Sequence, residues 1–363
     1  MAVAFYGTAK AVPFVQRSDQ KQAELISGFM YSERRRGLGE SMQCRLCGGH
    51  LSPWLEMPID GKKDQPTPFK SLIRCDDCRT GMLTPQPKAD QITELYQVPA
   101  YYTHGESHIR EVPSNLLDKV LTKLSWKLDR PISFDPENIA EVLPKSGSVC
   151  DLGCGDGSTL KRFKELGFGD TGVEPDPSSR ELATDSELNV LSGTAEMLPD
   201  ELVNRQFDLV IMRHSLEHCI DPGLAIANAY RLTREGGYFY CEVPNCECVH
   251  FETLTICSET FDSPRHLWFF TPDGLRRAIE SKGYVFQSWR FEGFTRHHSP
   301  SWRAWEVTIF DRLAKRGQAK GAKRHTFSKS LSILAKSAFA PADRKYDCVG
   351  VVARKVSNPS SAF

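Results

Sequence analysis

Apolar residues from position 146 onward follow two alternating spacings, one typical of buried strands and the other of amphipathic helices. The segment SVCDLGCGDGSTLKRFKELG begins with a short strand, after which Leu160, Phe163 and Leu166 recur at the spacing of one helical face. Strands that alternate with helices in this way indicate βαβ units, which build a parallel sheet with helices on its faces. We therefore predict an α/β fold with a doubly wound core that begins near this point.

The segments outside this core differ from it in composition and divide the chain further. In chain order we expect an N-terminal extension at 1–40, a cysteine-containing module at 41–85, a helical connector at 86–145, the core at 146–293, a basic helical insertion at 294–346, a final core strand at 347–355 and a tail at 356–363. A chain of 363 residues, 40% of them hydrophobic, is sufficient for a sizeable core.

Charge and hydropathy restrict the partners and the location of the protein. The 46 basic residues balance 46 acidic residues, so the molecule lacks the excess positive charge typical of nucleic-acid-binding proteins. The sequence has no apolar run of about 18 residues to span a membrane, and the segment 1–20 lacks the apolar stretch of a signal peptide. We therefore expect a cytoplasmic protein, with nucleic acid a disfavoured partner.

Twelve cysteines in a chain without an export signal indicate reduced thiols or metal ligands. Four of them form two Cys-x-x-Cys pairs, Cys44 with Cys47 and Cys75 with Cys78, each followed closely by a glycine. Two such pairs surround one zinc ion with four thiolates, while the glycine lets the backbone turn beneath the sulfur atoms. The polar stretch between the pairs is too poor in apolar residues to fold unaided, so we expect structural Zn2+ to supply the folding free energy. We expect the other eight cysteines to be buried or incidental thiols.

The first strand-to-helix turn of the core carries a glycine-rich loop, DLGCGDG at 151–157. Glycines at such a turn let a ligand approach the bare backbone and the N-terminus of the following helix. The next strand ends in Glu174, 23 residues after Asp151, which suits a carboxylate that binds both hydroxyls of a ribose. Ser158 stands where a dinucleotide fingerprint needs its third glycine, so the loop favours a nucleoside cofactor over a dinucleotide.

Four segments together resemble the class I S-adenosylmethionine-dependent methyltransferases: DLGCGDG, VEPD at 173–176, GTAEMLP at 193–199 and FDLVIMRHSLEH at 207–218. The resemblance implies a Rossmann-like, seven-stranded methyltransferase sheet and the cofactor S-adenosyl-L-methionine. In this family the glycine loop holds the methionine part, the acidic strand end binds the ribose, and the turn after the third strand borders the adenine. The cofactor-binding residues implied are Asp151, Gly153, Cys154, Gly155, Glu174, Pro175, Thr194, Ala195, Glu196, Arg213 and His214. Many members have Asp at the position of Thr194, so we expect the adenine amino group to meet Thr194 or backbone groups here.

The methyl acceptor is expected outside the carboxyl ends of the strands, where loops follow the fourth and fifth strands. An alcohol acceptor needs a base to remove its proton, and histidine is suited because its unperturbed pKa is about 6.5. Three histidines compete for this role: His266, which we favour, His214 and His218. The rival interpretation is a metal site, because HSLEH at 214–218 is similar to the E-x-x-E-H segment with which some quinone-precursor and RNA-terminus methyltransferases hold a divalent ion. Here His214 replaces the first glutamate, and His266 is a candidate fourth ligand.

The C-terminal insertion is basic, with 12 Lys or Arg residues against three acidic residues between positions 294 and 345. Apolar side chains expected on one helical face within it are those of Trp302, Trp305, Ile309 and Leu313. A basic helix with Trp on its apolar side is typical of helices at a membrane surface, which predicts a peripheral membrane contact through 300–340. The alternative is that this face packs on the core, and RNA is a third candidate partner.

A cysteine-pair module ahead of such a core is similar to an arrangement seen in sugar-modifying methyltransferases. Segments 101–108 and 261–284 are similar to parts of methyltransferases linked to surface-polysaccharide assembly. We therefore expect an enzyme that O-methylates a sugar hydroxyl in a nucleotide-linked, lipid-linked or polysaccharide acceptor. The alternatives are metal-assisted methylation of RNA or of a quinone precursor, C-methylation of a sugar, and a non-catalytic protein that binds the cofactor.

Overall fold

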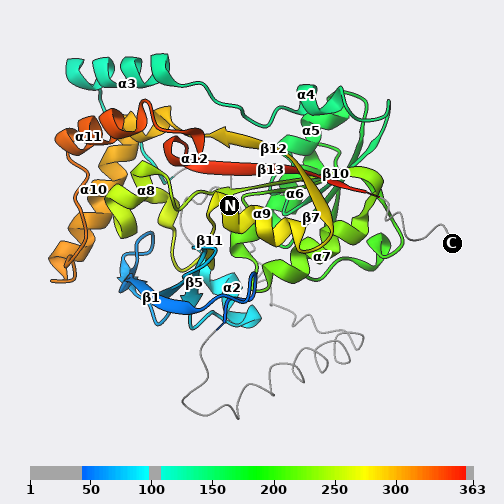
Figure 1. Ribbon diagram of the computed structural model, residues 1–363, viewed down its shortest axis with the longest axis horizontal. Coiled ribbons are helices and arrows are strands. Elements are labelled where there is room, and N and C mark those ends of the chain that lie inside the picture. Colours follow the sequence, from blue (N-terminus) through cyan, green and yellow to red (C-terminus); the bar gives the residue numbers. More distant parts are fainter. Residues whose placement is uncertain (1–42, 98–107, 357–363) are drawn as a thin grey trace, which may run out of the picture. The chain divides into compact units, whose positions relative to one another are not determined.

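The computed structural model describes residues 43–97 and 108–356, so the expected N-terminal extension, most of the segment 101–108 and nearly all of the tail lie outside it. A seven-stranded sheet forms the centre (Figure 1). In spatial order its strands are β12 (Tyr284–Glu292), β13 (Cys348–Lys355), β10 (Thr233–Pro244), β9 (Phe207–Arg213), β6 (Ser148–Leu152), β7 (Gly169–Glu174) and β8 (Asn189–Ser192). Strand β13 is antiparallel to both its neighbours, whereas all pairs from β10 to β8 are parallel. This confirms the predicted doubly wound sheet.

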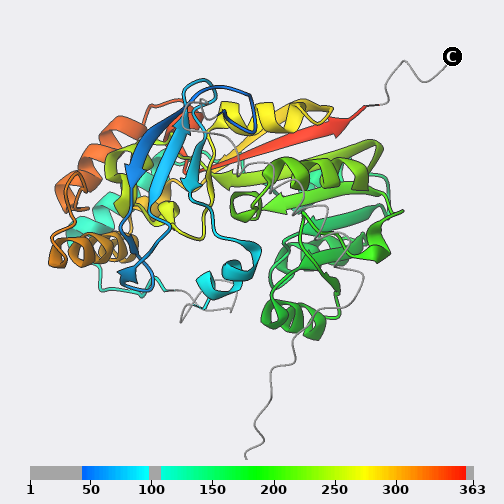
Figure 2. The same ribbon diagram turned by 90° about the horizontal axis from the view of Figure 1, so that it is seen from below.

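Helices cover both faces of this sheet, because alternate side chains of each strand point to opposite faces (Figures 1 and 2). On β9, Leu209 and Ile211 belong to one buried cluster, and Val210 and Met212 belong to the other. The first cluster includes side chains of α4 (Pro136–Ala140), α5 (Ser158–Glu165) and α6 (Pro177–Asp185), and the second includes side chains of α7 (Pro222–Leu232) and α9 (Pro272–Glu280). The apolar spacing on α5 is confirmed for its first two positions, but Leu166 is the C-cap and is exposed.

A second sheet connects the cysteine module with the core. Its strands, in order, are β1 (Leu51–Glu56), β4 (Ser71–Cys75), β5 (Gly81–Thr84) and β11 (Trp268–Phe269), and a small hairpin is formed by β2 (Ile59–Asp60) and β3 (Gln65–Pro66). Strand β11 comes from the long loop after β10 and pairs with β5, Trp268 opposite Met82 and Phe269 opposite Gly81. The module therefore shares a sheet with the loop in which we expected the acceptor to bind.

Short elements complete the described chain. They are α2 (Ala89–Leu95), α3 (Leu116–Leu128), η3 (Asp200–Leu202), η4 (Leu216–His218), α8 (Val249–Leu254), η5 (Thr255–Cys257), η6 (Glu259–Phe261), η7 (Thr295–His298), α10 (Pro300–Lys315), α11 (Phe327–Ser337) and α12 (Ala342–Lys345). Within the described residues, no helix is both long and apolar enough to cross a membrane.

The basic insertion packs on the core through the face that we expected at a membrane surface. On α10, Ile309 and Leu313 are 5% and 0% exposed and belong to the main core cluster. Trp302 and Trp305 donate their indole N–H groups to glutamate side chains that are themselves buried. The apolar face of α10 therefore packs on the core, as the alternative interpretation predicted, and a peripheral membrane contact elsewhere in 300–340 stays a prediction.

Candidate functional site

The glycine-rich loop leaves β6 in a conformation that only glycine adopts easily. Gly153, Gly155 and Gly157 have φ of 83°, 55° and 77°. A Cβ on Gly153 would lie 2.6 Å from the Cβ of Ser215, so the loop after β9 touches the glycine loop directly. A Cβ on Gly155 would meet no atom within 4 Å. The backbone at Gly155 is therefore open to a ligand, while that at Gly153 packs against the protein.

Glu174 ends β7 and holds this loop in place. One carboxylate oxygen accepts the N–H of Gly155 at 2.9 Å, and the other accepts the N–H of Asp176 at 2.9 Å. Burial raises the pKa of Glu174, whereas these two N–H groups lower it. Each oxygen retains a lone pair for a further donor, as two ribose hydroxyls would supply.

Asp151 is the second buried carboxylate of the cofactor region. It is 3% exposed, and its Oδ1 atom has no hydrogen-bond partner among the described residues. Burial raises the pKa of Asp151 to about 7, against the lowering effect of Arg213. An unpartnered carboxylate oxygen in this position fits a cationic group of a ligand, such as the ammonium group of S-adenosylmethionine.

The turn expected to border the adenine is fixed by internal hydrogen bonds. The Oγ1 of Thr194 accepts the N–H of Met197 at 2.9 Å. Asn228 of α7 donates its Nδ2–H groups to the carbonyls of Ala195 and Glu196 at 2.9 and 3.0 Å. Asn228 was not found from the sequence, because a single Asn within an amphipathic helix carries no recognisable motif.

Arg213 and His214 leave β9 beside the glycine loop, and both contact Glu242 of the neighbouring strand β10. The guanidinium of Arg213 lies 3.0 Å from Glu242 Oε1, and the His214 Nε2 atom lies 3.4 Å from the same oxygen. Another guanidinium nitrogen of Arg213 lies 3.5 Å from the hydroxyl of Thr159 in the first turn of α5. Glu242 itself was not found from the sequence, since its partners lie on another strand.

Glu217, His218 and His266 form a compact cluster, in which one ligand atom from each residue lies within 4.8 Å of the others. Glu217 is 1% exposed, and neither of its carboxylate oxygens has a hydrogen-bond partner among the residues described. The nearest atoms of His214 and His218 lie 3.6 and 3.9 Å from Glu217 Oε1, beyond hydrogen-bond distance. Against the lowering effect of burial, Cys348 and Glu217 raise the pKa of His214 well above its usual value, so the His214 imidazolium is the nearest cation to Glu217. The carboxylate oxygens still have acceptor positions for a further donor or a cation.

The two histidines of this cluster are oriented by backbone carbonyls. The Nδ1 of His218 lies 3.0 Å from the Arg265 carbonyl oxygen, and the Nδ1 of His266 lies 3.0 Å from the Thr260 carbonyl oxygen. A carbonyl only accepts, so each Nδ1 carries the proton and each neutral ring keeps a lone pair on Nε2. Histidines that bind metals are usually held in this way. Burial, assisted by His218, lowers the pKa of His266 to about 4.

The cysteine module supports the loop that carries these groups. Arg265, completely buried, forms two hydrogen bonds of 2.8 Å with Asp60 of the module and one of 2.8 Å with Asp262. Lys62 of the module lies 2.9 Å from Asp262. The module thus fixes the residue whose carbonyl orients His218. This pairing could not be predicted from local patterns, because the partners lie 205 positions apart.

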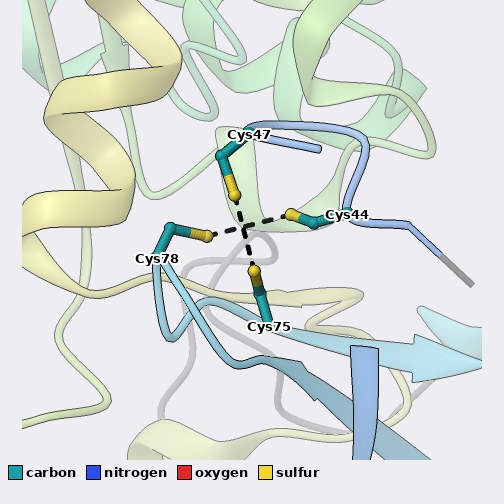
Figure 3. A group of neighbouring side chains, drawn as sticks. All are labelled: Cys44, Cys47, Cys75 and Cys78. Atoms are coloured by element: carbon teal, nitrogen blue, oxygen red, sulfur yellow. Dashed lines mark hydrogen bonds between the residues drawn. The ribbon is translucent and has the colours of Figure 1, made fainter. Parts of the chain in front are cut away.

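The four predicted zinc ligands come together at the edge of the second sheet (Figure 3). Their sulfur atoms point toward a common centre, with Cys44 and Cys78 3.8 Å apart and Cys47 and Cys75 3.4 Å apart. Zinc bound tetrahedrally by thiolates at about 2.3 Å requires sulfur separations of about 3.8 Å, so the donor set fits Zn2+.

The glycines beside the two cysteine pairs differ in their role. Gly48 adopts φ of 78° and turns the backbone after the first pair, as predicted. The prediction for Gly81 is wrong, because Arg79 takes the positive φ, 58°, after the second pair. Gly81 instead makes room for the ring of Trp54, which a Cβ would approach to 2.4 Å. The remaining eight cysteines are all free and buried, as expected.

A second histidine cluster joins α8 to the C-terminal insertion and was not found from the sequence. Glu306 accepts hydrogen bonds from the backbone N–H of Glu259 at 3.0 Å and the indole of Trp302 at 3.1 Å, and it contacts His250 at 3.0 Å and His325 at 2.5 Å. The acceptor positions of this buried carboxylate are therefore used by the protein itself. We interpret the cluster as a structural hydrogen-bond centre.

Comparisons with known proteins agree with this fold. Residues 127–288 match the profile of a family described as a methyltransferase domain. A ubiquinone biosynthesis O-methyltransferase of Methylobacterium sp. (strain 4-46) is 30% identical over 148 residues, which cover 38% of this chain and 59% of the relative. The relative of the same description in Ruegeria sp. (strain TM1040) is 27% identical over 191 residues, 47% of this chain and 74% of that protein. The chain thus spans about three fifths of the length of the first relative.

Among solved structures, the chain is similar to a SAM-dependent methyltransferase, possible histamine N-methyltransferase, from Thermotoga maritima. The TM-score is 0.40 and the identity 19%, with 66% of this chain and 91% of that chain covered. The family match and the strand order together confirm the predicted mixed α/β methyltransferase fold.

Proposed function

We propose that this protein transfers a methyl group from S-adenosylmethionine to a hydroxyl oxygen of an acceptor bound at Glu217, His218 and His266. The cofactor residues on which this rests are Asp151, Glu174 and the open backbone at Gly155. The observation that carries the proposal is the buried carboxylate of Glu217, which accepts no hydrogen bond from the described residues and lies beside two histidines whose Nε2 lone pairs are available.

The chemistry asked of the protein is limited, because the sulfonium of the donor already activates the methyl group. The acceptor oxygen must be aligned with it and must lose its proton. Contact between Gly153 and Ser215 places the glycine loop next to the segment that bears Glu217. This contact supports the proposal that the acceptor oxygen binds at the cluster, close to the methionine end of the cofactor.

The donor set of the cluster also fits a divalent cation, since two neutral imidazoles and one carboxylate form a common set of ligands. A bound cation would polarise the acceptor hydroxyl and favour its ionised form. In this version Glu217, His218 and His266 would be the ligands, with His214 nearby. An oxygen acceptor agrees with the description of the relatives as ubiquinone biosynthesis O-methyltransferases, and a hydroxyl of a quinone precursor is then the favoured acceptor class.

A second candidate is a sugar hydroxyl as acceptor, with a histidine as the base. It is favoured by the free Nε2 atoms of His218 and His266, either of which accepts a proton without losing its carbonyl partner. With its pKa lowered to about 4, His266 is a weak base at neutral pH, so His218 is the stronger candidate in this version.

The test measures the transfer of tritium from methyl-labelled S-adenosylmethionine to catechol and to a set of nucleotide sugars. We expect Glu217→Gln and His266→Ala to lose at least 100-fold in turnover while they retain affinity for S-adenosylhomocysteine. His50→Ala, at an exposed histidine of the cysteine module, serves as control and should keep full activity.

The outcomes separate the two versions. Activity that disappears with a mild chelator and returns with Mg2+, Mn2+ or Zn2+ supports the cation, whereas activity that resists chelation but requires His218 supports the base. Full activity of His218→Ala would contradict both versions of the site, because His218 is a ligand in the first and the base in the second.

A further inference from the structure

Helix α3 (Leu116–Leu128) exposes most of its apolar side chains and buries a side on which polar residues accompany Leu121. Its buried residues are Asp118, Leu121 and Ser125. Asp118 forms an ion pair with Arg303 of α10, and Thr122 donates its hydroxyl to the carbonyl of His298 at 3.3 Å. A helix of a globular protein normally has the opposite arrangement, with its apolar stripe toward the core. The side of α3 that faces away from the protein is therefore the unusual one.

Large apolar side chains gather on this outer side. Their exposed fractions lie between 46% and 75%, for Leu116, Leu117, Val120, Leu124 and Trp126. Leu116, Val120 and Leu124 follow each other at intervals of four residues, which places them in one row along the helix. An apolar row of this kind on a monomer surface marks a site of contact with another molecule or a membrane.

A row of lysines lies beside the apolar row. Lys119, Lys123 and Lys127 also repeat every four residues, and all three are exposed. The one acidic side chain of the helix, Asp118, is on the buried side and neutralised by Arg303. The outer face therefore presents leucine, valine, tryptophan and lysine without an exposed acid.

The apolar row and the lysine row together determine which kind of partner the outer face of α3 can bind. A second copy of the same face would bring lysines against lysines, which like-charge repulsion disfavours. An anionic phospholipid surface matches both rows, because apolar side chains enter the acyl boundary while the lysine stems extend to the phosphates. Tryptophan is also favoured at this boundary.

We propose that the outer face of α3 binds the surface of anionic phospholipid membranes, with the helix axis parallel to the membrane. The face is defined by Leu116, Leu117, Lys119, Val120, Lys123, Leu124, Trp126 and Lys127. Figure 1 shows α3 at the periphery, next to α11, where a flat surface can reach it. This contact replaces the one predicted for α10, and it does not depend on the identity of the methyl acceptor.

The experiment is co-sedimentation of the full chain with vesicles of phosphatidylcholine alone and of phosphatidylcholine with one fifth phosphatidylserine. We expect the affinity to be at least tenfold higher with phosphatidylserine and to fall as salt rises. The triple variant L116S/V120S/L124S and the triple variant K119Q/K123Q/K127Q should each lose at least tenfold in affinity. A matched control, L166S/L182S/V203S, changes three exposed apolar residues elsewhere and should bind like the unchanged protein.

The side chains changed are exposed, so circular dichroism should show an unaltered fold in every variant. Equal binding to both kinds of vesicle, or equal binding by the α3 variants and the control, would overturn the proposal. Sedimentation velocity distinguishes a membrane from a second copy of the chain as the partner. A dimer of the unchanged protein that is absent in L116S/V120S/L124S would assign this face to a second copy instead.

Discussion

The ion pair between Asp60 and Arg265 makes a quantitative prediction about how the cysteine module supports the active site. Arg265 is 0% exposed and Asp60 4%, measured on their side chains, and two hydrogen bonds of 2.8 Å join them. Asp60→Asn keeps the size of the side chain but leaves the guanidinium with Asp262 as its remaining charged partner. Removing one member of a buried pair typically costs about 3–5 kcal/mol of folding free energy.

The assay is thermal unfolding followed by circular dichroism, with urea unfolding for the free energy. Because Asp262 remains, we expect a loss of about 3 kcal/mol, which corresponds to a fall in Tm of roughly 4 °C for a chain of 363 residues. The matched control is Asp64→Asn in the same module, where the carboxylate is 43% exposed and pairs with Arg316 at 2.6 Å. An exposed pair contributes about 1 kcal/mol or less, so the control should change little.

The same variant also tests the link to His218, whose orientation depends on the carbonyl of Arg265. We expect Asp60→Asn to lower methyl transfer by roughly tenfold or more, as misplaced catalytic groups do, with the affinity for S-adenosylhomocysteine unchanged. Equal effects of Asp60→Asn and Asp64→Asn on stability would refute the reasoning. Weakened cofactor binding with normal transfer would likewise show that the module acts elsewhere.

Three further predictions concern metal and pH. Elemental analysis should find at least one zinc ion per chain. The variant Cys75→Ser should contain one zinc ion fewer and have a lower Tm. An unchanged zinc content in this variant would contradict the site. The affinity for S-adenosylhomocysteine should rise as the pH increases toward about 7 and should be constant above it. The reason is that the carboxyl of Asp151, whose pKa burial raises to about 7, must ionise to pair with the ammonium group of the ligand. Calorimetry between pH 5.5 and 8 should show this increase, and Asp151→Asn should abolish it. Burial lowers the pKa of His297 to about 4 and that of His298 to about 2, below the 6.5 of an unfolded chain. Below pH 6.5 the unfolded chain therefore binds more protons than the folded protein. The free energy of unfolding should fall from pH 6.5 to pH 4 by about 1.4 kcal/mol per pH unit for each histidine. Midpoints of urea unfolding that do not change over this range would contradict the burial of these rings.

Local patterns predicted the parts of the fold that depend on neighbouring residues. The strand-to-helix alternation extends over a few dozen positions, so the sheet was predicted correctly. The glycine loop and Glu174 were recognisable for the same reason, and their role in cofactor binding stays a prediction. The two cysteine pairs were equally readable, because a Cys-x-x-Cys turn places two sulfur atoms on one side without help from the rest of the chain.

Contacts between distant segments could not be predicted from such local patterns. The pairing of Asp60 with Arg265 and the two-residue strand β11 depend on how the module docks against the core, and neither leaves a periodic signal. The face of α10 illustrates the same limit, because the spacing of Ile309 and Leu313 indicates an apolar side without indicating what covers it. The burial of Asp118 on α3 could not be predicted for a related reason, because its ion-pair partner Arg303 lies on another helix.

The central claim is that the chain binds S-adenosylmethionine through Asp151, Glu174 and the loop between them. Calorimetric titration with S-adenosylhomocysteine tests this directly. The account predicts one binding site per chain and at least tenfold weaker binding by Glu174→Gln, with no change for Glu187→Gln at the end of α6. The absence of binding at millimolar ligand by the folded protein, or equal affinity of Glu174→Gln and the unchanged chain, would contradict it.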